Sequence, residues 1–568
     1  MLVCAELEGK MSDVISSESE TAPSRLSFVR RHAPLFEAVG FLSMMVAYIV
    51  AAALKLNDSI LIYARDDTYI HMSIAKHLVL HHVWGVTPYA FVSASSSPLW
   101  TSILAASYWL FGVGDKAPLV LSLLSAIALL ILIDKLLRRA RLTESEITVV
   151  LFAVVFAMPM PYLVLDAMEP ALHTIFTIAF LYCASELLSA QRNRYRDAIV
   201  LAILAPLLVA ARFEGLFLLT LTAALFVIRR RYLYAILLLG LGAIPVAIVG
   251  IPSMIHGGWI LPNSVMLKGN WPSGTVLASV LHLAFGAMVN FVWSKVVCLI
   301  ALLTIAALFL SADRKNQWNV PRVRLALFLG ILFAHLTFAH VGRPFRYEAY
   351  LVVTGIFVLA SCLKEPWCEH LIARLRNLSR RSAFASAAIA SLMLLVSLPL
   401  AGRGLSGLLL ADRASHNCFE QQYQMARFAR RFYEGQALVL NDIGFVTYLA
   451  DIKLIDVVGL GTTEVARGRA RYDVNALERI SYNQGAKIAM VYPSWLPGVP
   501  NQWTKVGEWE VDDIRIALGA RIVVFFATNP AEAEPLRGHL EQFDRELPAE
   551  VSARVEPRGT PTASASTH

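Results

Sequence analysis

The chain has 568 residues, of which 57% are hydrophobic and only 16% are charged, and its formal net charge is +8. Soluble domains average about 45–50% apolar and about 25% charged residues, so this composition excludes an ordinary soluble enzyme and a disordered chain. Long apolar runs also exclude an outer-membrane barrel, whose strands alternate. The six cysteines follow no zinc or disulfide spacing. The class that is left is a helical membrane protein with several spans.

The chain begins with a polar segment and continues into a long apolar module. Residues 1–34 are rich in Ser and Glu and contain no apolar stretch of signal-peptide length, so we expect a disordered cytoplasmic tail. Over 35–403 the apolar runs predict about eleven spans, each near the length that crosses ~30 Å of hydrocarbon. The runs lie at 36–56, 117–137, 147–165, 170–189, 197–211, 213–229, 232–254, 294–311, 322–341, 346–363 and 384–402.

The segment 98–112 is apolar but short, which is typical of a re-entrant or juxtamembrane helix. If it does not span, the basic clusters of the later loops all share the side of Arg30 and Arg31. These clusters are Arg138/Arg139/Arg141, Arg192/Arg194/Arg196, Arg229/Arg230/Arg231, Arg314/Lys315/Arg322/Arg324 and Arg374/Arg376/Arg380/Arg381. Because positive loops stay in the cytoplasm, the basic charge is mainly a topology signal and indicates no nucleic-acid surface. The N-terminus is then cytoplasmic, and the loops 57–116 and 255–293 lie on the outer side.

The region after residue 403 is less hydrophobic and lies on the outer side in this topology. Residues 404–545 are typical of a small α/β domain. Its strand-like segments are ALVLND (437–442), KLIDVV (453–458), AKIAMVY (486–492) and RIVVFFA (521–527). Residues 546–568 are expected to form a second disordered tail, because their end is rich in Pro, Ser, Thr and Ala.

Two adjacent carboxylates, Asp66 and Asp67, follow the first span and are the strongest single feature. A carboxylate near an apolar boundary can act as a general base if its pKa is raised, and its neighbour could orient it or bind a divalent cation. An equally good interpretation is that one of them caps the helix 68–80, because Asp is a favoured N-cap. That helix is amphipathic and is expected on the membrane surface, with His71 facing water or the site.

Several other polar residues fall at the outer boundary, where charged groups are costly. They are Glu169, Arg212, Glu214, Asn263, Lys268, Arg343 and Arg346. Arg212 either pairs with Glu214 or clamps a phosphate, for which guanidinium geometry is suited. Lys268 is a candidate phosphate ligand or a solvated loop residue. Positive charge on the outer side opposes the usual bias, so anion binding is the simplest role for Arg343 and Arg346. Carboxylates and cations at one membrane depth together fit a phosphate-bearing lipid.

The ordered motifs resemble those of the GT-C superfamily of polytopic glycosyltransferases, and most of all its bacterial arabinofuranosyltransferase and lipid-linked sugar transferase type. The segments that carry the resemblance are Asp66-Asp67-Thr68-Tyr69-Ile70, Ser96-Ser97-Pro98-Leu99-Trp100, Met168-Glu169-Pro170-Ala171-Leu172, Arg212-Phe213-Glu214-Gly215, Leu261-Pro262-Asn263-Ser264, Asn441-Asp442-Ile443-Gly444 and Ile455-Asp456-Val457-Val458-Gly459-Leu460. Pro170 stands where the superfamily has Thr, and Phe213 where it has Pro. Neither departure removes a charged group.

The resemblance implies an inverting transferase that uses a polyprenyl-phosphate sugar. Asp66 is the first choice for the base that activates an acceptor hydroxyl, and Asp67 is the second. Arg212, Lys268 and Arg346 are then candidates to hold the leaving phosphate. Glu169 would bind a hydroxyl, and 98–112 would form a wall of the lipid groove. Members differ in their need for a divalent cation and no ligand set stands out in this sequence, so metal dependence stays open.

The expected protein is therefore an all-α, GT-C-like polytopic membrane protein with a small C-terminal periplasmic α/β domain, in a bacterial inner membrane. Its expected partners are a polyprenyl-phosphate-linked sugar donor, a cell-envelope glycan or lipid acceptor and membrane lipid, with no nucleic acid. The alternatives are a non-catalytic transporter and an envelope-assembly scaffold. A transporter predicts paired charges at mid-membrane or broken helices in repeated halves, and the sequence has neither. A scaffold predicts that both aspartates are replaceable.

Overall fold

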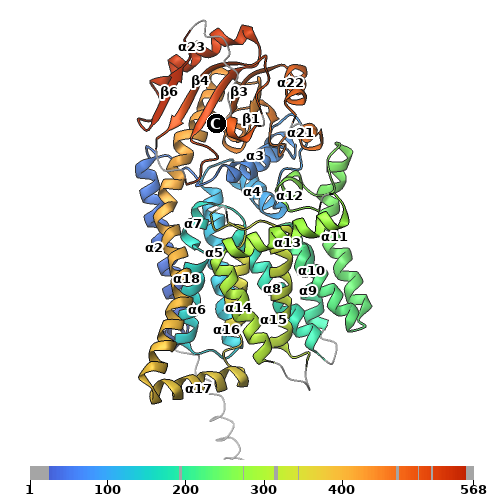
Figure 1. Ribbon diagram of the computed structural model, residues 1–568, viewed down its shortest axis with the longest axis vertical. Coiled ribbons are helices and arrows are strands. Elements are labelled where there is room, and N and C mark those ends of the chain that lie inside the picture. Colours follow the sequence, from blue (N-terminus) through green and yellow to red (C-terminus); the bar gives the residue numbers. More distant parts are fainter. Residues whose placement is uncertain are drawn as a thin grey trace, which may run out of the picture.

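A long helical bundle carries an α/β domain at one end in the computed structural model (Figure 1). The structure describes residues 25–190, 195–272, 274–311, 317–342, 344–468, 473–496, 498–512 and 516–557. Within these ranges, seven helices are long and apolar enough to cross a membrane, and three shorter apolar helices accompany them. The chain is thus a polytopic helical membrane protein with a small C-terminal sheet domain, as its composition predicts.

A helix occupies each position where the sequence predicts a span, and the span 147–165 is divided between two helices. These helices are α2 (Arg25–Leu56), α5 (Ala117–Arg139), α6 (Glu144–Ala157), α7 (Met160–Leu165), α8 (Pro170–Ser189), α9 (Tyr195–Ala211), α10 (Gly215–Ile228), α11 (Tyr232–Ile255), α14 (Lys295–Leu310), α15 (Val320–Phe338), α16 (Ala349–Ala360) and α18 (Ala383–Cys418). The predicted tail 1–34 differs at its end, because α2 begins at Arg25. Residues 1–24 lie outside the described ranges.

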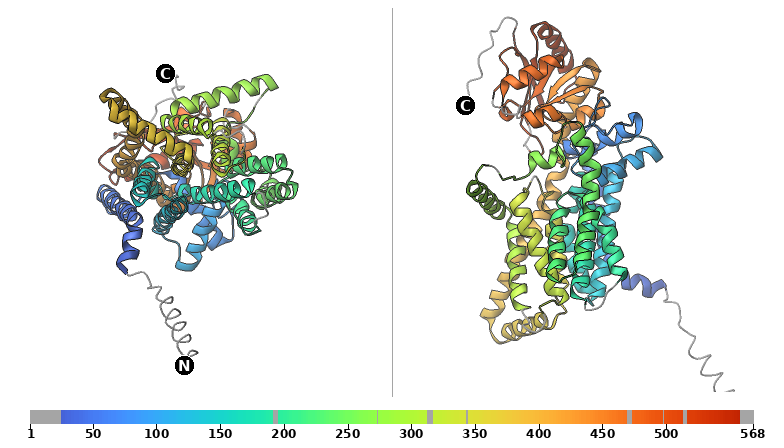
Figure 2. Two further views of the ribbon diagram at one scale, coloured as in Figure 1. Left: turned by 90° about the horizontal axis from the view of Figure 1, so that it is seen from below. Right: turned by 90° about the vertical axis from the view of Figure 1, so that its right-hand side faces the viewer.

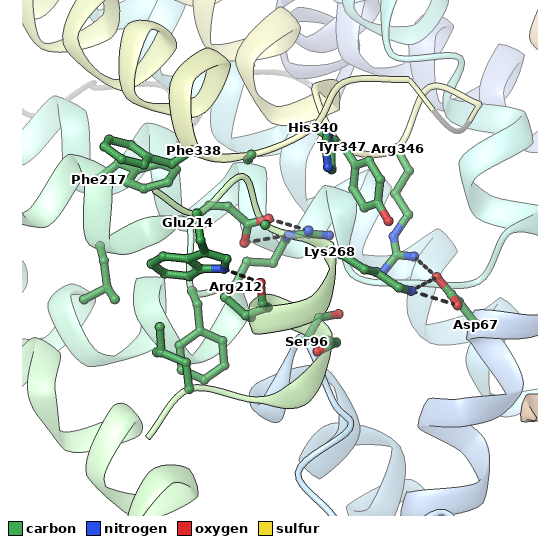
Figure 3. Close-up of a pocket in the computed structure, with 18 residues that line it drawn as sticks. Asp67, Ser96, Arg212, Glu214, Phe217, Lys268, Phe338, His340, Arg346 and Tyr347 are labelled. Carbon is green, nitrogen blue, oxygen red and sulfur yellow. Dashed lines mark hydrogen bonds and ion pairs between the residues drawn. The ribbon is translucent and has the colours of Figure 1, made fainter. Parts of the chain in front are cut away.

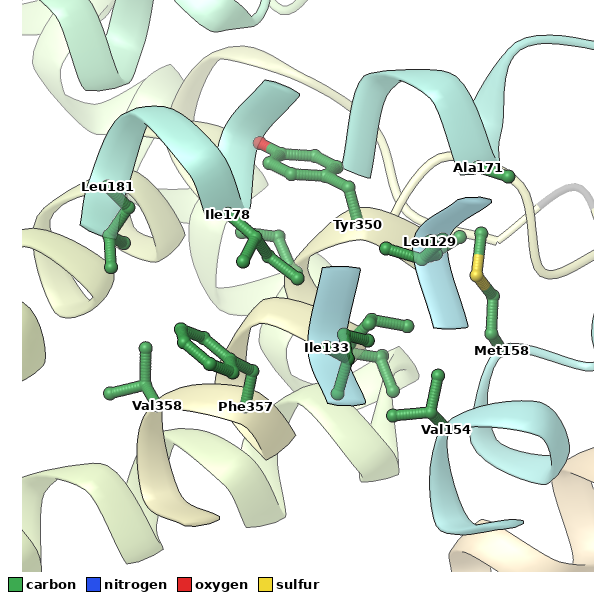
Figure 4. Close-up of a cluster of buried hydrophobic side chains, with 14 of the residues drawn as sticks. Leu129, Ile133, Val154, Met158, Ala171, Ile178, Leu181, Tyr350, Phe357 and Val358 are labelled. Carbon is green, nitrogen blue, oxygen red and sulfur yellow. The ribbon is translucent and has the colours of Figure 1, made fainter. Parts of the chain in front are cut away.

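Branched and aromatic side chains from several helices interlock at the centre of the bundle (Figure 4). Ile133 of α5, Val154 of α6, Ile178 of α8 and Phe357 of α16 are all buried there. Lipid is as apolar as these side chains, so close packing rather than escape from water holds the helices together. The bundle thereby forms a rigid support for the loops at the end that carries the α/β domain, which we call the outer end after the predicted topology.

Some helices lie across the bundle axis instead of along it (Figures 1 and 2). They are α3 (Asp66–His81), α4 (Pro98–Phe111), α12 (Asn263–Lys268) and α13 (Val276–Trp293) at the outer end, and α17 (Pro366–Arg381) at the opposite end. The short helix predicted at 98–112 corresponds to α4. The sequence did not predict α13 within the loop 255–293. Its composition would allow it to span, yet it lies beside the outer end of the bundle.

The α/β domain contains one mixed sheet in the order β2-β1-β3-β5-β4-β6. Its strands are β1 (Ala437–Leu440), β2 (Lys453–Asp456), β3 (Ala486–Val491), β4 (Thr504–Val511), β5 (Ile522–Ala527) and β6 (Val551–Val555). β1 is parallel to β2 and β3, and the remaining pairs are antiparallel. All four predicted strands are present. β6 corrects the expectation of a disordered tail from residue 546, because it pairs along the whole of its length with β4; residues 558–568 lie outside the described ranges.

The α/β domain is joined to the bundle by helix, not by a flexible linker. α18 continues through a π-helical turn, Phe419–Tyr423, into α19 (Gln424–Phe432). The predicted domain boundary at 403/404 therefore falls inside a helix. Such π-helical turns are rare and are often found at functional sites. This one directs Gln421 and Gln422 toward the sheet, where both contact Tyr492.

α3 lies between the bundle and the α/β domain, which corrects the prediction that it rests on the membrane surface. Most of its residues, including Tyr69, Ile70 and Met72, are buried. Its partner is α20 (Gly444–Leu449), the first helix after β1. Tyr69 stacks on Phe445 with ring centroids 3.8 Å apart. The α/β domain thus covers apolar residues of the predicted amphipathic helix.

Candidate functional site

A chain of alternating charges crosses the outer end of the bundle, and Figure 3 shows its two ends, Lys268 and Arg346 on Asp67 and Arg212 on Glu214. Arg346 donates from Nη1 to Asp67 Oδ2 at 2.9 Å and from Nη2 to Glu169 Oε1 at 3.1 Å. Arg212 donates to the same Glu169 oxygen at 2.6 Å and to both oxygens of Glu214 at 2.6 and 3.2 Å. Lys268 Nζ lies 3.3 Å from each oxygen of Asp67. Three carboxylates and three cations are therefore joined in one network.

Helix ends place these side chains at one depth. Asp67 lies in the first turn of α3, Glu169 directly precedes α8, and Lys268 ends α12. Arg212 lies in the turn between α9 and α10, and Arg346 lies in the turn before α16. Ahead of Glu169, Ala167 has a φ of 50°, a left-handed conformation that is costly for a residue with a Cβ. The surrounding helices hold that turn in place.

The neighbouring cations lower the pKa of each carboxylate in the network. Burial raises the pKa of Asp67, but Lys268, Arg346 and Arg65 outweigh burial and hold this pKa far below its usual range. Burial likewise raises the pKa of Glu169, and Arg346 and Arg212 outweigh it. The side chain of Asp67 is still 26% exposed, whereas Glu169 is fully buried. Asp67 is thus the most exposed carboxylate of the network, ahead of Glu214 at 18%.

Asp66 faces the α/β domain instead of the charge network. Its Oδ2 accepts a hydrogen bond from the backbone N–H of Gly444 at 2.7 Å, and its Oδ1 accepts one from Phe445 at 2.8 Å. It therefore caps α20 of the other domain, and no side-chain hydrogen bond caps α3 itself. Burial and the nearby Asp442 raise the pKa of Asp66. The expectation that one of the pair caps the helix 68–80 is therefore wrong: both residues lie inside α3, and Asp66 caps α20 instead.

Two cavities meet at Asp67. The first, the apolar cavity, has a volume of about 310 Å³ and is lined by Phe213, Leu216, Phe217, Leu261, Val265, Trp271 and Phe338 together with Arg212, Glu214, Lys268 and Arg346. The second, the interdomain cavity, has a volume of about 730 Å³ and lies between α3 and the ends of the sheet strands. Asp67, Lys268, His340 and Tyr347 line both cavities. No residue of α4 lines the apolar cavity, so α4 is not the expected wall of a groove there.

Two predicted residues lie outside this junction. His71 lies behind Glu169: its Nε2 is 4.0 Å from Glu169 Oε2, and its Nδ1 is 2.8 Å from the Thr101 hydroxyl. Burial lowers the pKa of His71 to about 4. Asn263 donates from Nδ2 to the carbonyls of Gly459 and Leu460, which ties α12 to the α/β domain. Arg343 lies outside the described residues.

The sequence interpretation assigned no role to Tyr347. The guanidinium carbons of Arg212 and Arg346 each lie 5.6 Å from the centroid of its ring, so this ring holds the two cations in place. Its position next to Arg346 in the turn was the available signal. Among the described residues, one trio, His416, Glu420 and Glu550, has the spacing of metal ligands. None of the three lines either cavity.

Comparison with known proteins finds a matching family model and similar solved structures. A family model described as a domain of unknown function, DUF8728, matches residues 414–526, which cover most of the α/β domain. The chain is also similar to the crystal structure of ArnT from Cupriavidus metallidurans bound to undecaprenyl phosphate. That similarity has a TM-score of 0.47 and 13% sequence identity, and it covers 87% of this chain and 99% of that chain. No curated protein matches the chain.

Proposed function

We propose that this protein is an inverting membrane glycosyltransferase that moves a sugar from a polyprenyl-phosphate donor to a cell-envelope glycan or lipid acceptor on the periplasmic face of a bacterial inner membrane. The observation that carries the proposal is the position of Asp67. This carboxylate lies where an apolar cavity with fixed cations meets a more polar cavity under the α/β domain. A lipid phosphate in one cavity and a hydroxyl-bearing acceptor in the other would meet at Asp67.

The apolar cavity suits the donor because it combines an aromatic and aliphatic lining with Lys268 and Arg346 at one end. The lining favours the isoprenoid units next to the phosphate. The two cations suit the phosphate oxygens and the charge that develops there as the sugar leaves. Arg212 is held by both oxygens of Glu214 and by Glu169, so we assign it to positioning Glu169 and not to first contact with phosphate.

Transfer requires a base on the acceptor side. Asp67 takes the proton of the acceptor hydroxyl as that oxygen forms a bond to the anomeric carbon. The bond from this carbon to the phosphate oxygen breaks, its electron pair stays on the phosphate, and the configuration inverts. The partners of Asp66 are backbone N–H groups of α20, whereas those of Asp67 are Lys268 and Arg346, cations for which a donor phosphate competes, so we choose Asp67 over Asp66 for this role.

The ion pairs of Asp67 couple base strength to donor binding. Without a donor, Lys268 and Arg346 hold the pKa of Asp67 very low, which makes it a poor base. A donor phosphate competes with Asp67 for both cations. As they turn toward the phosphate, the pKa of Asp67 rises toward the range in which a carboxylate accepts protons. Donor binding thus switches on the base, which limits reaction before the donor is in place.

The test compares Asp67→Asn and Lys268→Ala with the wild type. We expect Asp67→Asn to insert normally and to lower transfer about 10²–10⁴-fold, the usual loss when a general base is removed. It should bind undecaprenyl phosphate at least as well as wild type, because the cations lose a competitor. Lys268→Ala should weaken that binding. Surface glycans analysed by mass in complemented cells would reveal the transferred sugar.

Either of two results would overturn the proposal. The first is an Asp67→Asn protein that restores the full glycan, which would favour the transporter or the scaffold. The second is a wild-type protein that does not bind undecaprenyl phosphate.

A further inference from the structure

The interdomain cavity has a wall from the α/β domain that the proposed transfer chemistry does not use. Gln422, Asn441, Asp442, Ser494, Trp495 and Gly519 belong to this wall. This wall lies on the opposite side of the cavity from α3 and faces Asp67. We call these six residues the sheet-edge wall.

The sheet-edge wall lies where ligands usually bind in open α/β sheets. Asn441 and Asp442 follow β1, and Ser494 and Trp495 follow β3, its parallel neighbour. From β1 the chain crosses to β2 on one side and then returns to β3 on the other side of β1. The strand order therefore reverses between β1 and β3. The crevice outside the carboxyl ends of strands at such a reversal is the usual ligand site of this architecture.

Hydrogen bonds hold the polar side chains of the wall in place, and two of their polar atoms lack a hydrogen-bond partner. Asp442 Oδ2 accepts hydrogen bonds from the Tyr492 hydroxyl at 2.6 Å and from Gln422 Nε2 at 2.8 Å. Asn441 Oδ1 accepts one from the backbone N–H of Tyr492 at 2.9 Å. Among the described residues, Asn441 Nδ2 and Gln422 Oε1 have no hydrogen-bond partner, although Asn441 is 4% and Gln422 2% exposed. These two atoms are closed to solvent, so the groups of the wall that a ligand in the cavity can meet are those that line it, among them Asp442, Ser494 and Trp495.

The wall also presents an aromatic ring. Trp495 ends the short 3₁₀ helix Pro493–Trp495 and meets Tyr492 edge to face, with ring centroids 5.4 Å apart. A Cβ on Gly519 would lie 2.7 Å from the indole and 2.6 Å from Tyr492, so glycine leaves the room that the indole occupies. Among the described residues that the α/β domain contributes to this cavity, none is Lys, Arg or His. This wall is therefore unsuited to a phosphate.

We propose that the sheet-edge wall is a carbohydrate-binding subsite. A sugar ring has an apolar face that packs on an indole, and it has hydroxyls that both donate and accept hydrogen bonds with amides and a carboxylate. Because Asp67 lines the same cavity, a sugar on this wall lies within the space that the proposed base reaches. Its assignment to the acceptor or to the sugar of the donor rests on the proposed function, but carbohydrate binding itself does not.

The direct test is saturation-transfer NMR on the full-length protein in nanodiscs, with glucose, galactose, mannose and arabinose as separate probes at millimolar concentration. At least one sugar should receive saturation from the wild type. The signal should fall about tenfold in Trp495→Ala and in Asp442→Asn. It should be partly kept in Trp495→Phe, which retains a ring. Trp109→Ala is the matched control, because Trp109 is 74% exposed on α4.

Two outcomes overturn this subsite: no sugar receives saturation from the wild type, or the signal is unchanged in both Trp495→Ala and Asp442→Asn. Undecaprenyl phosphate binding is measured on the same samples. It tests the proposed function separately, because that ligand belongs in the other cavity.

The two sources of the sugar differ in the lipid that co-purifies with Trp495→Ala. If the subsite holds the acceptor, the variant still carries the glycosylated polyprenyl phosphate that wild type carries, as seen by mass spectrometry. If the subsite holds the donor sugar, the glycosylated lipid is lost and bare polyprenyl phosphate replaces it. Either pattern supports the subsite and assigns its ligand.

Discussion

Arg346 contacts two carboxylates that lie far apart in the sequence, Asp67 and Glu169. It is 4% exposed, so its charge depends on these partners and on the ring of Tyr347. A guanidinium can reach two acceptors in different directions from one plane, which a single ammonium cannot do. The network thus depends on the shape of the arginine as well as on its charge.

Arg346→Lys should therefore behave as a damaging substitution although it keeps the charge. We expect the free energy of unfolding to fall by ~1–3 kcal/mol, because one buried carboxylate loses a direct partner. Binding of undecaprenyl phosphate should also weaken. Thermal unfolding in detergent and ligand titration measure the two effects. Arg431→Lys is the control, because its pair with Glu546 is partly exposed and should contribute little. Equal behaviour of the two variants would show that the bridge is unimportant.

His71 gives the site a predictable response to pH. Burial lowers its pKa to about 4, whereas the unfolded chain titrates near the ordinary value of 6.5. Between these values the unfolded state binds the proton and the folded state does not. The contribution of a neutral His71 to the free energy of unfolding is therefore complete above pH ~6.5. It is lost as the pH falls toward 4, by at most ~1.4 kcal/mol per pH unit.

His71→Asn should make the fall of melting temperature between pH 7 and pH 5 less steep than in wild type. Other buried histidines still contribute, so the slope is reduced and not abolished. An identical slope in wild type and His71→Asn would contradict the assignment.

At the scale of elements, α3 is the surface on which the α/β domain rests. Asp66 caps α20, Ser73 and Thr447 share a hydrogen bond of 3.1 Å, and Lys76 Nζ donates to the carbonyl of Tyr448 at 3.0 Å. These contacts place the ends of β1 and β3 over Asp67. The geometry of the interdomain cavity therefore depends on how closely α20 approaches α3.

Gly444→Ala tests this approach. A Cβ at Gly444 would overlap the backbone carbonyl of Asp66, which cannot move without shifting α3. We expect the variant to insert in the membrane but to lose activity and to become more sensitive to proteolysis between α18 and the sheet. Gly538→Ala is the matched control, because a Cβ there meets nothing within 4 Å. Wild-type activity in Gly444→Ala would show that close docking is not required.

At the scale of the whole molecule, the α/β domain and the basic helix α17 lie at opposite ends of the bundle (Figure 1). α17 carries Arg380 and Arg381 in its last turn and has no buried residue. The positive-inside rule predicts that its end lies in the cytoplasm. The sheet domain and both cavities would then lie on the outer side, where the proposed lipid-linked donor would meet the proposed envelope acceptor.

Cysteine labelling tests that orientation. In a background without native cysteines, Tyr482→Cys lies on the α/β domain and Arg376→Cys lies on α17, both at exposed positions. An impermeant maleimide added to intact spheroplasts should label the first variant only, and inside-out vesicles should reverse the pattern. Labelling of Arg376→Cys from outside would show that the topology is the reverse of the predicted one, and it would contradict the proposed periplasmic site.

The sequence by itself determined the class of the protein, the positions of its membrane helices and four strands of its sheet. These features depend on local hydropathy and on strand propensity, which act over a few residues. β4 and β6 escaped notice because edge and near-edge strands carry charged residues, such as Glu508 and Arg554, in place of continuous apolar runs.

Only the tertiary structure separated Asp66 from Asp67, which are neighbours in one motif. Their partners lie hundreds of residues away: Gly444 and Phe445 engage Asp66, whereas Lys268 and Arg346 engage Asp67. The tertiary structure likewise brought Asp442 and Trp495 to a single crevice. The periodicity and spacing of residues in the sequence predict which side chains share a face of a helix or strand. The tertiary packing decides which other residues that face contacts. For this reason the chemistry of the outer end could be expected from the sequence, and its division among individual residues could not.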